Sequence, residues 1–426
     1  MARERRVKKG SMVRALIAVD HHFVRASTGE VYLGPPMALA GYRFWEQYLE
    51  AFDEIVVLAR VRRAENGTPT TVRADGPRVS FCDLPDFLGP WEYLHSVPAL
   101  RSSIQQAVEQ ADTSILRVPG TVGQLAWKTI RGLGRPYALD VVADPWDMFS
   151  RGAAPSPVRP VVRRAWSNRL RQMCREAPAI SYVTREALQK RYPPGPRCWA
   201  AAFSDVDLRD GLIDSAELGA RMADLEHRMS YGAARCHFRI GFVGALAQMY
   251  KAPDILLQAI ALCIDDGFDF EVSLAGDGKF RPAMASLARR LGIADRVRFL
   301  GVLPPGDAVR RFLDQVDLFV LPSRQEGLPR AMVEAMARGC PCIGTAVGGI
   351  PELLPPEDLA VSGDAAALSA KIREVIADPD RMSRMAQQNW KTAREYRPDL
   401  LEGRRTAFYR RVREQAEQAK KSPQTI

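Results

Sequence analysis

The sequence lacks several features that define other classes of protein. No apolar run in its 426 residues approaches the roughly 20 residues that a membrane-spanning helix needs. The seven cysteines are odd in number and have no paired spacing, which argues against a disulfide framework and favours a cytoplasmic protein. Cys340 and Cys342 have no second cluster of cysteine or histidine that would complete a zinc site. We therefore expect neither a metal nor a cofactor.

Acidic residues are outnumbered by basic ones, 50 against 60, which gives a net charge of +10 and indicates an anionic partner. The arginines are dispersed along helical segments, and no zinc-finger, RNA-recognition or basic-zipper pattern accompanies them, so we expect no nucleic acid. A basic segment near the C-terminus, residues 400–421, allows two interpretations. Its apolar stripe either packs on the body of the protein, which we favour, or makes peripheral contact with the inner face of a membrane; the stripe comprises Leu400, Leu401, Phe408, Tyr409 and Val412.

Strand-like apolar runs alternate with amphipathic segments along most of the chain. Such alternation builds parallel sheets that are covered by helices on both faces. We predict two doubly wound, Rossmann-like α/β domains that face each other across a cleft. The predicted parts are a disordered basic arm at 1–11, an N-terminal domain at 12–200, a linker at 201–237, a C-terminal domain at 238–380, and C-terminal helices at 381–426 that could cross back to the N-terminal domain.

The stretch "EGLPRAMVEAMARG" places Glu326 in a loop and Glu334 more than one turn inside the following helix. Pro329 suits the first helical position, which leaves Leu328 as the cap. Neither Leu328 nor Gly327 has a side-chain oxygen to cap the first-turn amides, so the helix start is a candidate anion site. Two carboxylates that bracket this site would accept hydrogen bonds from sugar hydroxyls. The combination fits a nucleotide-sugar, although Glu334 could instead be an ordinary solvated helical residue.

The same stretch carries a resemblance to a known family. "LFVLPSRQEGLPRAMVEAMARGCPCIGTAVGGIPELL", together with the upstream "FVGALAQMYKAPDILLQAI" and "VSLAGDGKFRPAMASLARRLGIADRVRFLGVLP", resembles the donor site of retaining glycosyltransferases of family four, which have the GT-B fold. The resemblance covers roughly residues 238–362. It implies a metal-independent, hexosyltransferase-type enzyme with a nucleoside diphosphate sugar, foremost a UDP- or GDP-sugar, as donor. The implied acceptor is a glycan, a lipid-linked sugar or a small molecule.

The resemblance also implies roles for individual residues of the second half. Glu334 would hold the hydroxyls of the nucleotide ribose, and Glu326 the hydroxyls of the transferred sugar. Backbone amides around Gly327 and Leu328 would meet the diphosphate. Lys251, in "QMYKAPD", would neutralise the departing diphosphate, although a lysine at a helix start is usually only solvated.

Departures from the family pattern are as informative as the matches. Gly244 is in its expected place at the donor site, but the next residue is Ala245 where many members have an arginine. Arg324 or an arginine of the N-terminal half could supply the missing charge. The first loop usually has a glycine pair that faces the phosphate, and here Gly29 stands in the corresponding place. Many members have a histidine near the transferred sugar, and Asp144 is the nearest positional substitute.

Purely structural interpretations of the N-terminal candidates remain open. Asp144 precedes a proline and is typical of a turn. His21 and His22 follow the first predicted strand, and we favour a packed or exposed position for them over a role in the cleft. The whole protein could also be a non-catalytic nucleotide-sugar-binding protein, or a sugar-nucleotide epimerase on the same fold. The favoured interpretation is a glycosyltransferase of glycan, glycolipid or metabolite biosynthesis.

Overall fold

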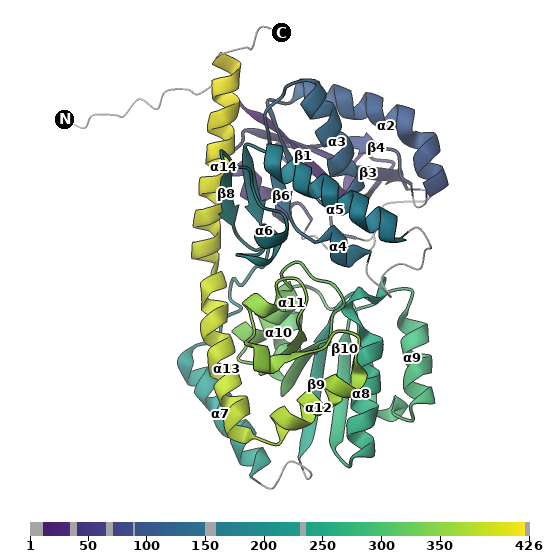
Figure 1. Cartoon of the computed structure of the whole chain (residues 1–426), viewed down its shortest axis with the longest axis vertical. Coiled ribbons are helices and arrows are strands. Elements are labelled where there is room, and N and C mark those ends of the chain that lie inside the picture. The colour runs from purple at the N-terminus through teal and green to yellow at the C-terminus, as the bar shows by residue number, and fades with distance from the viewer. Residues whose placement is uncertain are drawn as a thin grey trace, which may run out of the picture.

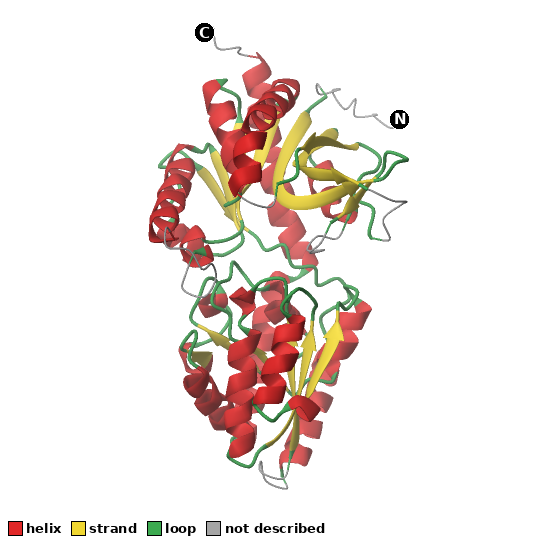
Figure 2. Cartoon of the chain, turned by 90° about the vertical axis from the view of Figure 1, so that its right-hand side faces the viewer, coloured by secondary structure: helices red, strands yellow, loops and turns green. Residues whose placement is uncertain are grey.

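The computed structural model describes residues 12–34, 41–64, 71–87, 90–149, 159–230 and 236–421. The predicted arm at 1–11 lies outside the described residues. Two α/β domains are stacked along the long axis of the molecule, with the first half of the chain in one and most of the second half in the other (Figure 1). The view from the side shows a sheet in each domain with helices packed around it (Figure 2).

The N-terminal domain contains an eight-stranded sheet. Its order is β4 (Val79–Leu84), β3 (Glu54–Arg63), β1 (Arg14–Arg25), β5 (Thr113–Val118), β6 (Tyr137–Val141), β7 (Ala179–Tyr182) and β8 (Trp199–Ala202), all parallel, and β2 (Val31–Leu33) pairs antiparallel with β1. The strands β5, β6 and β7 are buried at every position, as expected for a parallel sheet covered on both faces. The strand β1 is longer than the sequence predicts, because it continues past a register shift between Ala18 and His22.

The C-terminal domain contains a six-stranded sheet. Its order is β11 (Val297–Gly301), β10 (Asp269–Ala275), β9 (His237–Val243), β12 (Leu318–Leu321), β13 (Cys342–Thr345) and β14 (Leu359–Ala360). All neighbouring strands pair in parallel, and the order reverses direction beside the first strand, which is the doubly wound topology. The predicted fold class, two doubly wound Rossmann-like domains, is confirmed.

Helices connect the strands in both halves. Those of the N-terminal domain are α1 (Arg43–Leu49), α2 (Pro90–Gln110), α3 (Thr121–Gly132), α4 (Pro145–Met148), α5 (Arg159–Glu176) and α6 (Ala187–Arg191). Those of the C-terminal domain are α8 (Pro253–Asp265), α9 (Arg281–Arg290), α10 (Asp307–Asp314), α11 (Arg330–Ala337) and α12 (Ala365–Ile376). Within the described residues, every helix is too short or too polar to span a lipid bilayer.

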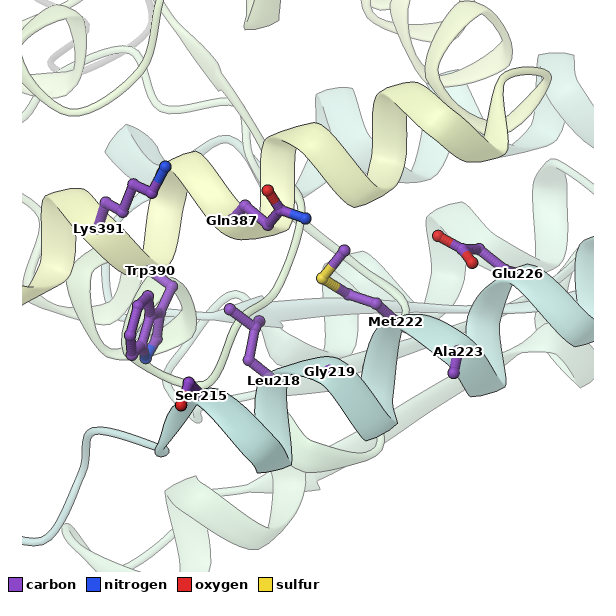
Figure 3. A pocket seen from close by; sticks show the side chains of 9 residues that line it. All are labelled: Ser215, Leu218, Gly219, Met222, Ala223, Glu226, Gln387, Trp390 and Lys391. Carbon is purple, nitrogen blue, oxygen red and sulfur yellow. The ribbon is translucent and has the colours of Figure 1, made fainter.

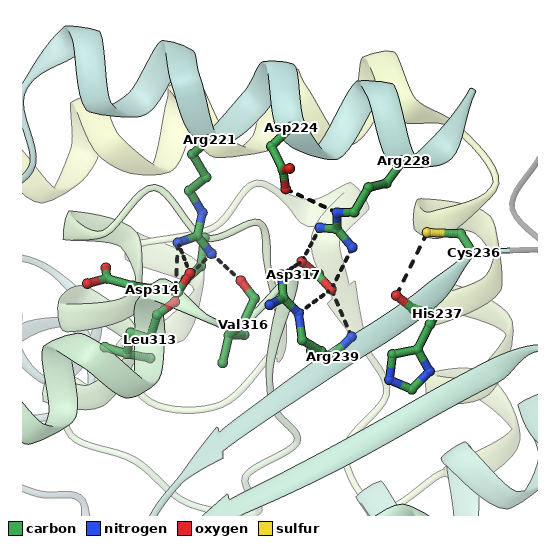
Figure 4. A network of polar contacts seen from close by, with 11 residues as sticks. Arg221, Asp224, Arg228, Cys236, His237, Arg239, Leu313, Asp314, Val316 and Asp317 are labelled. Atoms are coloured by element: carbon green, nitrogen blue, oxygen red, sulfur yellow. Dashed lines mark hydrogen bonds and ion pairs between the residues drawn. The ribbon is translucent and has the colours of Figure 1, made fainter. Parts of the chain in front are cut away.

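The predicted linker at 201–237 is mostly structured. Its first residues belong to β8, and it contains α7 (Ser215–Met229), which begins with a capping box formed by Asp214 and Glu217. Arg228 of α7 and Arg239 of β9 both bind the buried carboxylate of Asp317, at 3.3 and 2.8 Å (Figure 4). These contacts fix α7 to the C-terminal domain, so this helix is part of that domain rather than of a free linker.

The C-terminal helices run along one side of both domains. Helix α13 (Pro379–Ala393) packs on α7 and α11, and α14 (Pro398–Lys421) lies beside α1, β5 and β8 of the N-terminal domain (Figure 1). In α14, the ring of Phe408 stacks on the ring of Trp199, with 5.2 Å between their centroids. The ring centroids of Tyr409 and Tyr48 lie 4.6 Å apart. Four of the five residues of the predicted apolar stripe are buried here, and Leu400 remains exposed. The stripe is therefore a packing face and not a surface for a membrane.

Candidate functional site

The domains touch where loops at the carboxyl edges of their sheets meet. A Cβ atom at Gly327, in the loop after β12, would lie 2.3 Å from the carbonyl oxygen of Val142, in the loop after β6. Only glycine permits so close an approach of the two backbones. Nearby, the carboxylate of Glu352 caps α6 across the domain boundary, with 2.6 Å from Oε1 to the amide of Ala187 and from Oε2 to the amide of Arg185. The candidate residues of the donor motif thus lie at the boundary between the domains.

A buried ion pair stands at the centre of the motif. The Nζ atom of Lys251 donates to Oε1 of Glu326 at 2.7 Å, and the hydroxyl of Ser323 donates to the same oxygen at 2.6 Å. Burial disfavours the charged form of Lys251, but the charge of Glu326 outweighs this effect and raises the pKa of the lysine. Both of these contacts are made by Oε1 of Glu326. They fix the orientation of the carboxylate and leave its other oxygen, Oε2, outside the ion pair.

Helix α11 begins without a side-chain cap, as the sequence predicts. Its cap residue is Pro329 and its first helical residue is Arg330, so the predicted start is wrong by one position and Leu328 precedes the cap. Met332 and Val333 donate to the carbonyl of Pro329, at 3.1 and 3.3 Å. The first-turn amides and the helix dipole make this end electropositive, which suits an anion.

Glu334 lies one turn inside α11 and is half-buried. Burial raises its pKa, and the nearby positive charge of Arg330 only partly offsets that effect. A half-buried carboxylate with a raised pKa is more characteristic of a binding site than of a solvated helix face. The structure pairs Lys251 with Glu326, and Glu334 lies on the helix that follows the loop of Glu326.

Gly244 follows β9 and is in contact with the lysine of the motif. A Cβ atom there would lie 3.2 Å from Cδ of Lys251 and 3.0 Å from the ring of Phe242, so a side chain at this position would displace the lysine. Arg324, a predicted substitute for the arginine missing at Ala245, has other partners. Its guanidinium binds both carboxylate oxygens of Asp254, at 2.9 and 2.7 Å, and the carbonyl of Met249 at 2.9 Å. Arg324 therefore holds the start of α8, and its role as a substitute for the missing charge stays a prediction.

Asp144 has a structural role that its sequence context also allowed. Its carboxylate caps α4 by accepting from the amide of Trp146 at 2.7 Å, and it also binds the hydroxyl of Tyr192 and the guanidinium of Arg191. The residue is 3% exposed. Both carboxylate oxygens thus have partners inside the domain, and the role of Asp144 near the transferred sugar stays a prediction that these contacts do not support.

Gly29 also has a local explanation. It lies in the turn between β1 and β2 with φ of +104°, and a Cβ atom there would meet nothing within 4 Å. The turn needs glycine for its backbone conformation, and the prediction that Gly29 faces the phosphate finds no contact to support it. Gly120, at the cap of α3, approaches β1 closely, since its Cβ would lie 2.9 Å from Cβ of Asp20. The sequence contained no signal for this contact between distant segments.

His21 and His22 lie within β1 rather than after it. His22 binds Asp86 at 2.7 Å, whereas Nδ1 of His21 is buried and has no hydrogen-bond partner among the described residues. Burial, with the charges of Arg117 and Arg330, lowers the pKa of His21 to about 3, so the ring is neutral at physiological pH. An unsatisfied buried nitrogen is costly unless a ligand completes it, which makes His21 a candidate that the sequence did not favour.

A buried charge cluster lies under His21 in the N-terminal domain. Arg117 of β5 binds Asp140 of β6 at 2.6 Å and Asp205, just after β8, at 2.5 Å. Ser181 of β7 donates to Asp140 at 2.8 Å. The cluster joins strands that are distant in the sequence, and it holds two carboxylates and one guanidinium inside the sheet.

A shallow groove lies elsewhere, between α7 and α13 on the C-terminal domain (Figure 3). It has a volume of about 400 Å³ and is lined by Leu218, Met222 and Trp390, with Glu226 and Lys391 at its sides. It contains none of the residues of the donor motif. In the part of the chain that the structure describes, no group of three or more histidine, cysteine or acidic side chains is placed to hold a metal, and the seven cysteines are unpaired.

Comparison with known sequences finds a family match within the second half of the chain. Residues 237–378 match the family of glycosyl transferases group 1. The chain is 22% identical over 335 residues to protein CapJ from Staphylococcus aureus, which covers 79% of this chain and 80% of CapJ. It is 35% identical over 143 residues to 2-deoxystreptamine glucosyltransferase from Streptomyces kanamyceticus, which covers 33% of this chain and 36% of that protein. The chain thus matches little more than a third of that second relative.

Solved structures extend the likeness to the whole chain. Sucrose-phosphate synthase from Thermosynechococcus elongatus superposes with a TM-score of 0.66 at 14% identity, over 94% of this chain and 99% of that one. Anabaena HepE in complex with UDP-glucose superposes with a TM-score of 0.57 at 18% identity, over 96% and 99%. At these identities the likeness concerns the fold, which is GT-B, the fold that the sequence predicted.

Proposed function

We propose that this protein is a retaining glycosyltransferase that moves a sugar from a nucleoside diphosphate sugar to an acceptor without a metal ion. The observation that carries the proposal is the carboxylate of Glu326, buried and bound by Lys251 and Ser323 beside the uncapped start of α11. Glu326 also lies within residues 237–378, which match the family of glycosyl transferases group 1, and this match supports the same proposal. The HepE structure contains UDP-glucose, which is consistent with a nucleotide-sugar donor here.

Each group of the C-terminal site has a proposed role. Glu334 accepts hydrogen bonds from the ribose hydroxyls, and the remaining oxygen of Glu326 accepts one from a hydroxyl of the transferred sugar. The amides of Gly327 and Leu328, with the first-turn amides of α11, meet the diphosphate. Lys251 lies beside Glu326 and faces the charge that grows on the leaving group.

The proposed reaction needs no protein nucleophile. The bond between the anomeric carbon and the leaving phosphate oxygen breaks, and the acceptor oxygen bonds to the same face of that carbon. The acceptor proton passes to the leaving phosphate oxygen, so the products are a glycoside and a nucleoside diphosphate. The protein stabilises the developing negative charge with fixed dipoles and cations, and contact between the domains excludes water.

The first experiment is thermal unfolding with UDP, GDP, ADP and TDP, each with and without a magnesium chelator. A ligand at about 100 times its dissociation constant stabilises the folded state by roughly 2.7 kcal/mol, which is a readily measured shift. We expect one nucleotide to raise the unfolding temperature, without need for magnesium, and the shift to disappear in Glu334→Ala. The anomeric configuration of the product, read by NMR, then separates retention from inversion. If a nucleotide binds but neither sugar transfer nor donor hydrolysis can be detected, the proposal is contradicted. A non-catalytic nucleotide-sugar-binding protein would then be favoured.

A further inference from the structure

The carboxylate of Glu326 is held by two hydrogen-bond donors that differ in how firmly they are fixed. Ser323, in the same loop, donates from its hydroxyl to Oε1 at 2.6 Å. Lys251, in the segment that follows β9, donates from Nζ to the same oxygen at 2.7 Å. The serine hydroxyl is attached directly to Cβ, whereas the ammonium of the lysine ends a flexible stem of methylene groups. If one donor moves during the reaction, it is the lysine.

The position of Ser323 is set by the sheet. The residue follows β12, is fully buried, and accepts at its carbonyl from the hydroxyls of Thr345 at 2.6 Å and Ser362 at 3.1 Å. Thr345 ends β13 and Ser362 follows β14, so three neighbouring strand ends converge on this serine. The carboxyl ends of parallel strands lie at one edge of a sheet, which explains the convergence. The fold therefore fixes Ser323 independently of any ligand.

Backbone hydrogen bonds hold the loop around Glu326 on both sides. The amide of Arg324 donates to the carbonyl of Tyr250 at 2.7 Å, directly before the lysine. The amide of Gly349 donates to the carbonyl of Gly327 at 2.6 Å. These bonds fix the backbones that carry the carboxylate and the ammonium, so only the two side chains can rearrange.

The lysine has a second task in the proposed reaction. Within the described residues its ammonium donates one hydrogen bond, to Glu326, and lies 5.5 Å from the ring centroid of Tyr250. More than one of its hydrogens can donate, so Lys251 can also bind a phosphate oxygen. As negative charge grows on the leaving diphosphate, the ammonium is drawn toward it and its contact with Oε1 weakens. The hydrogen bond from Ser323 does not depend on the diphosphate.

We propose that Ser323 is a positioning residue for sugar transfer. Its hydroxyl holds Oε1 of Glu326, so that Oε2 stays directed at the transferred sugar while Lys251 serves the leaving diphosphate. The inference rests on the proposed function and gives the two donors separate tasks: the serine orients the carboxylate, and the lysine stabilises the leaving group. A small error in the position of a group that contacts the reacting sugar lowers turnover strongly and changes the binding of the nucleotide little.

The test separates turnover from binding. Calorimetric titration with UDP, GDP, ADP and TDP identifies the nucleotide that binds. Its conjugates with glucose, galactose and N-acetylglucosamine then serve as donors, and release of the nucleoside diphosphate gives the rate. We expect Ser323→Ala to lower kcat by about tenfold and to change the affinity for the nucleoside diphosphate by less than about twofold. In the Glu326→Ala background the same change should cost less than about twofold, because no carboxylate is left to orient.

Ser383→Ala is the matched control. Ser383 is also buried, and its hydroxyl donates to a glutamate, Glu226, at the same 2.6 Å. This pair joins α13 to α7 beside the groove of Figure 3, which contains no residue of the donor motif. We expect Ser383→Ala to leave kcat and nucleotide affinity unchanged.

Three results would overturn the inference and leave the proposed function in place. They are an unchanged kcat in Ser323→Ala, equal losses of kcat and nucleotide affinity, and a full tenfold loss, on the order expected for an orienting contact, in the Glu326→Ala background. If the wild-type protein binds no nucleotide, or releases none from any of these donors, the proposed function fails and the inference fails with it.

Discussion

The two halves of this protein build their parts of the cleft in different ways. In the C-terminal domain the key side chains come from one short motif, in which Ser323, Glu326, Arg330 and Glu334 follow one another along a loop and the first turns of α11. In the N-terminal domain the corresponding groups, such as His21 and the Arg117 cluster, come from separate strands. A motif of the first kind can be recognised in a sequence, whereas the second kind exists only after the sheet has formed.

The halves also use charge differently. In the N-terminal domain the positive charge of Arg117 is buried and is shared between Asp140 and Asp205. In the C-terminal domain the pair of Lys251 and Glu326 lies at the boundary between the domains, in front of the uncapped start of α11. The comparison suggests that the charges of the first half stabilise the fold and that those of the second half bind the donor. The predictions below test this division, from the largest expected effect to the smallest.

Removal of the buried guanidinium should cost mainly stability. We expect Arg117→Ala to lower the free energy of unfolding by roughly 3–5 kcal/mol, because Asp140 and Asp205 are left buried without a counter-charge. Urea denaturation measures the loss, and nucleotide affinity measured on the folded fraction should stay near that of the wild type. Arg131→Ala, which breaks an exposed pair with Glu176, is the control and should cost less than about 1 kcal/mol. Equal effects of the two changes would contradict the assignment.

Neutralisation of Glu326 should cost mainly activity. We expect Glu326→Gln to slow sugar transfer or donor hydrolysis by on the order of 10²–10³-fold, since the reacting sugar loses its acceptor and Lys251 loses its partner. Rates of nucleoside diphosphate release measure the effect. Glu402→Gln, an exposed change on α14, controls for the loss of one negative charge. Normal turnover in this variant would show that Glu326 does not take part in catalysis.

The contact between the domains offers an intermediate test. Glu352→Gln removes the negative charge that caps α6 from the opposite domain. We expect the contact between the two domains to weaken by roughly 1 kcal/mol, as for the loss of other helix caps. Small-angle scattering with bound nucleotide should show a larger radius of gyration for the variant. An unchanged radius together with an unchanged turnover would show that this cap does not hold the domains together.

The smallest expected effect concerns pH. Burial raises the pKa of Glu334, so this carboxyl takes up a proton on acidification at a higher pH than an ordinary glutamate; Arg330 and Lys251 act against the shift and Asp207 acts with it. Since the ionised form accepts the ribose hydrogen bonds, nucleotide affinity should fall as the pH drops through the raised pKa and should be constant above it. Calorimetric titration between about pH 4 and 8 measures the profile. In Glu334→Gln this step should be absent, and a step that persists there belongs to another group.

The sequence predicted the fold and the C-terminal half of the site for a physical reason. Alternating strands and helices specify parallel, doubly wound domains, and a helix start without a cap is visible in the residues themselves. Where the prediction depended on one position, as for the cap at Leu328, it was wrong by a single residue. Lys251 lies far from Glu326 in the chain; the family resemblance implied a role for the lysine at the diphosphate, but its ion pair with Glu326 was found only in the structure.

In the N-terminal half, local structure explains the residues that the sequence put forward as site candidates. Asp144 and Gly29 have the residue types that a site would use, but a cap on α4 and a turn after β1 account for them. His21 had no distinguishing pattern, and its buried nitrogen became a candidate only when β1 continued beyond its predicted end. Sequence alone determined the architecture and the uncapped helix start, because both depend on short-range periodicity and helix chemistry; the donor roles of individual residues came from the family resemblance and stay predictions. Tertiary structure decided which charges are buried, which are paired and which face the cleft, because these depend on contacts between residues that are distant in the chain.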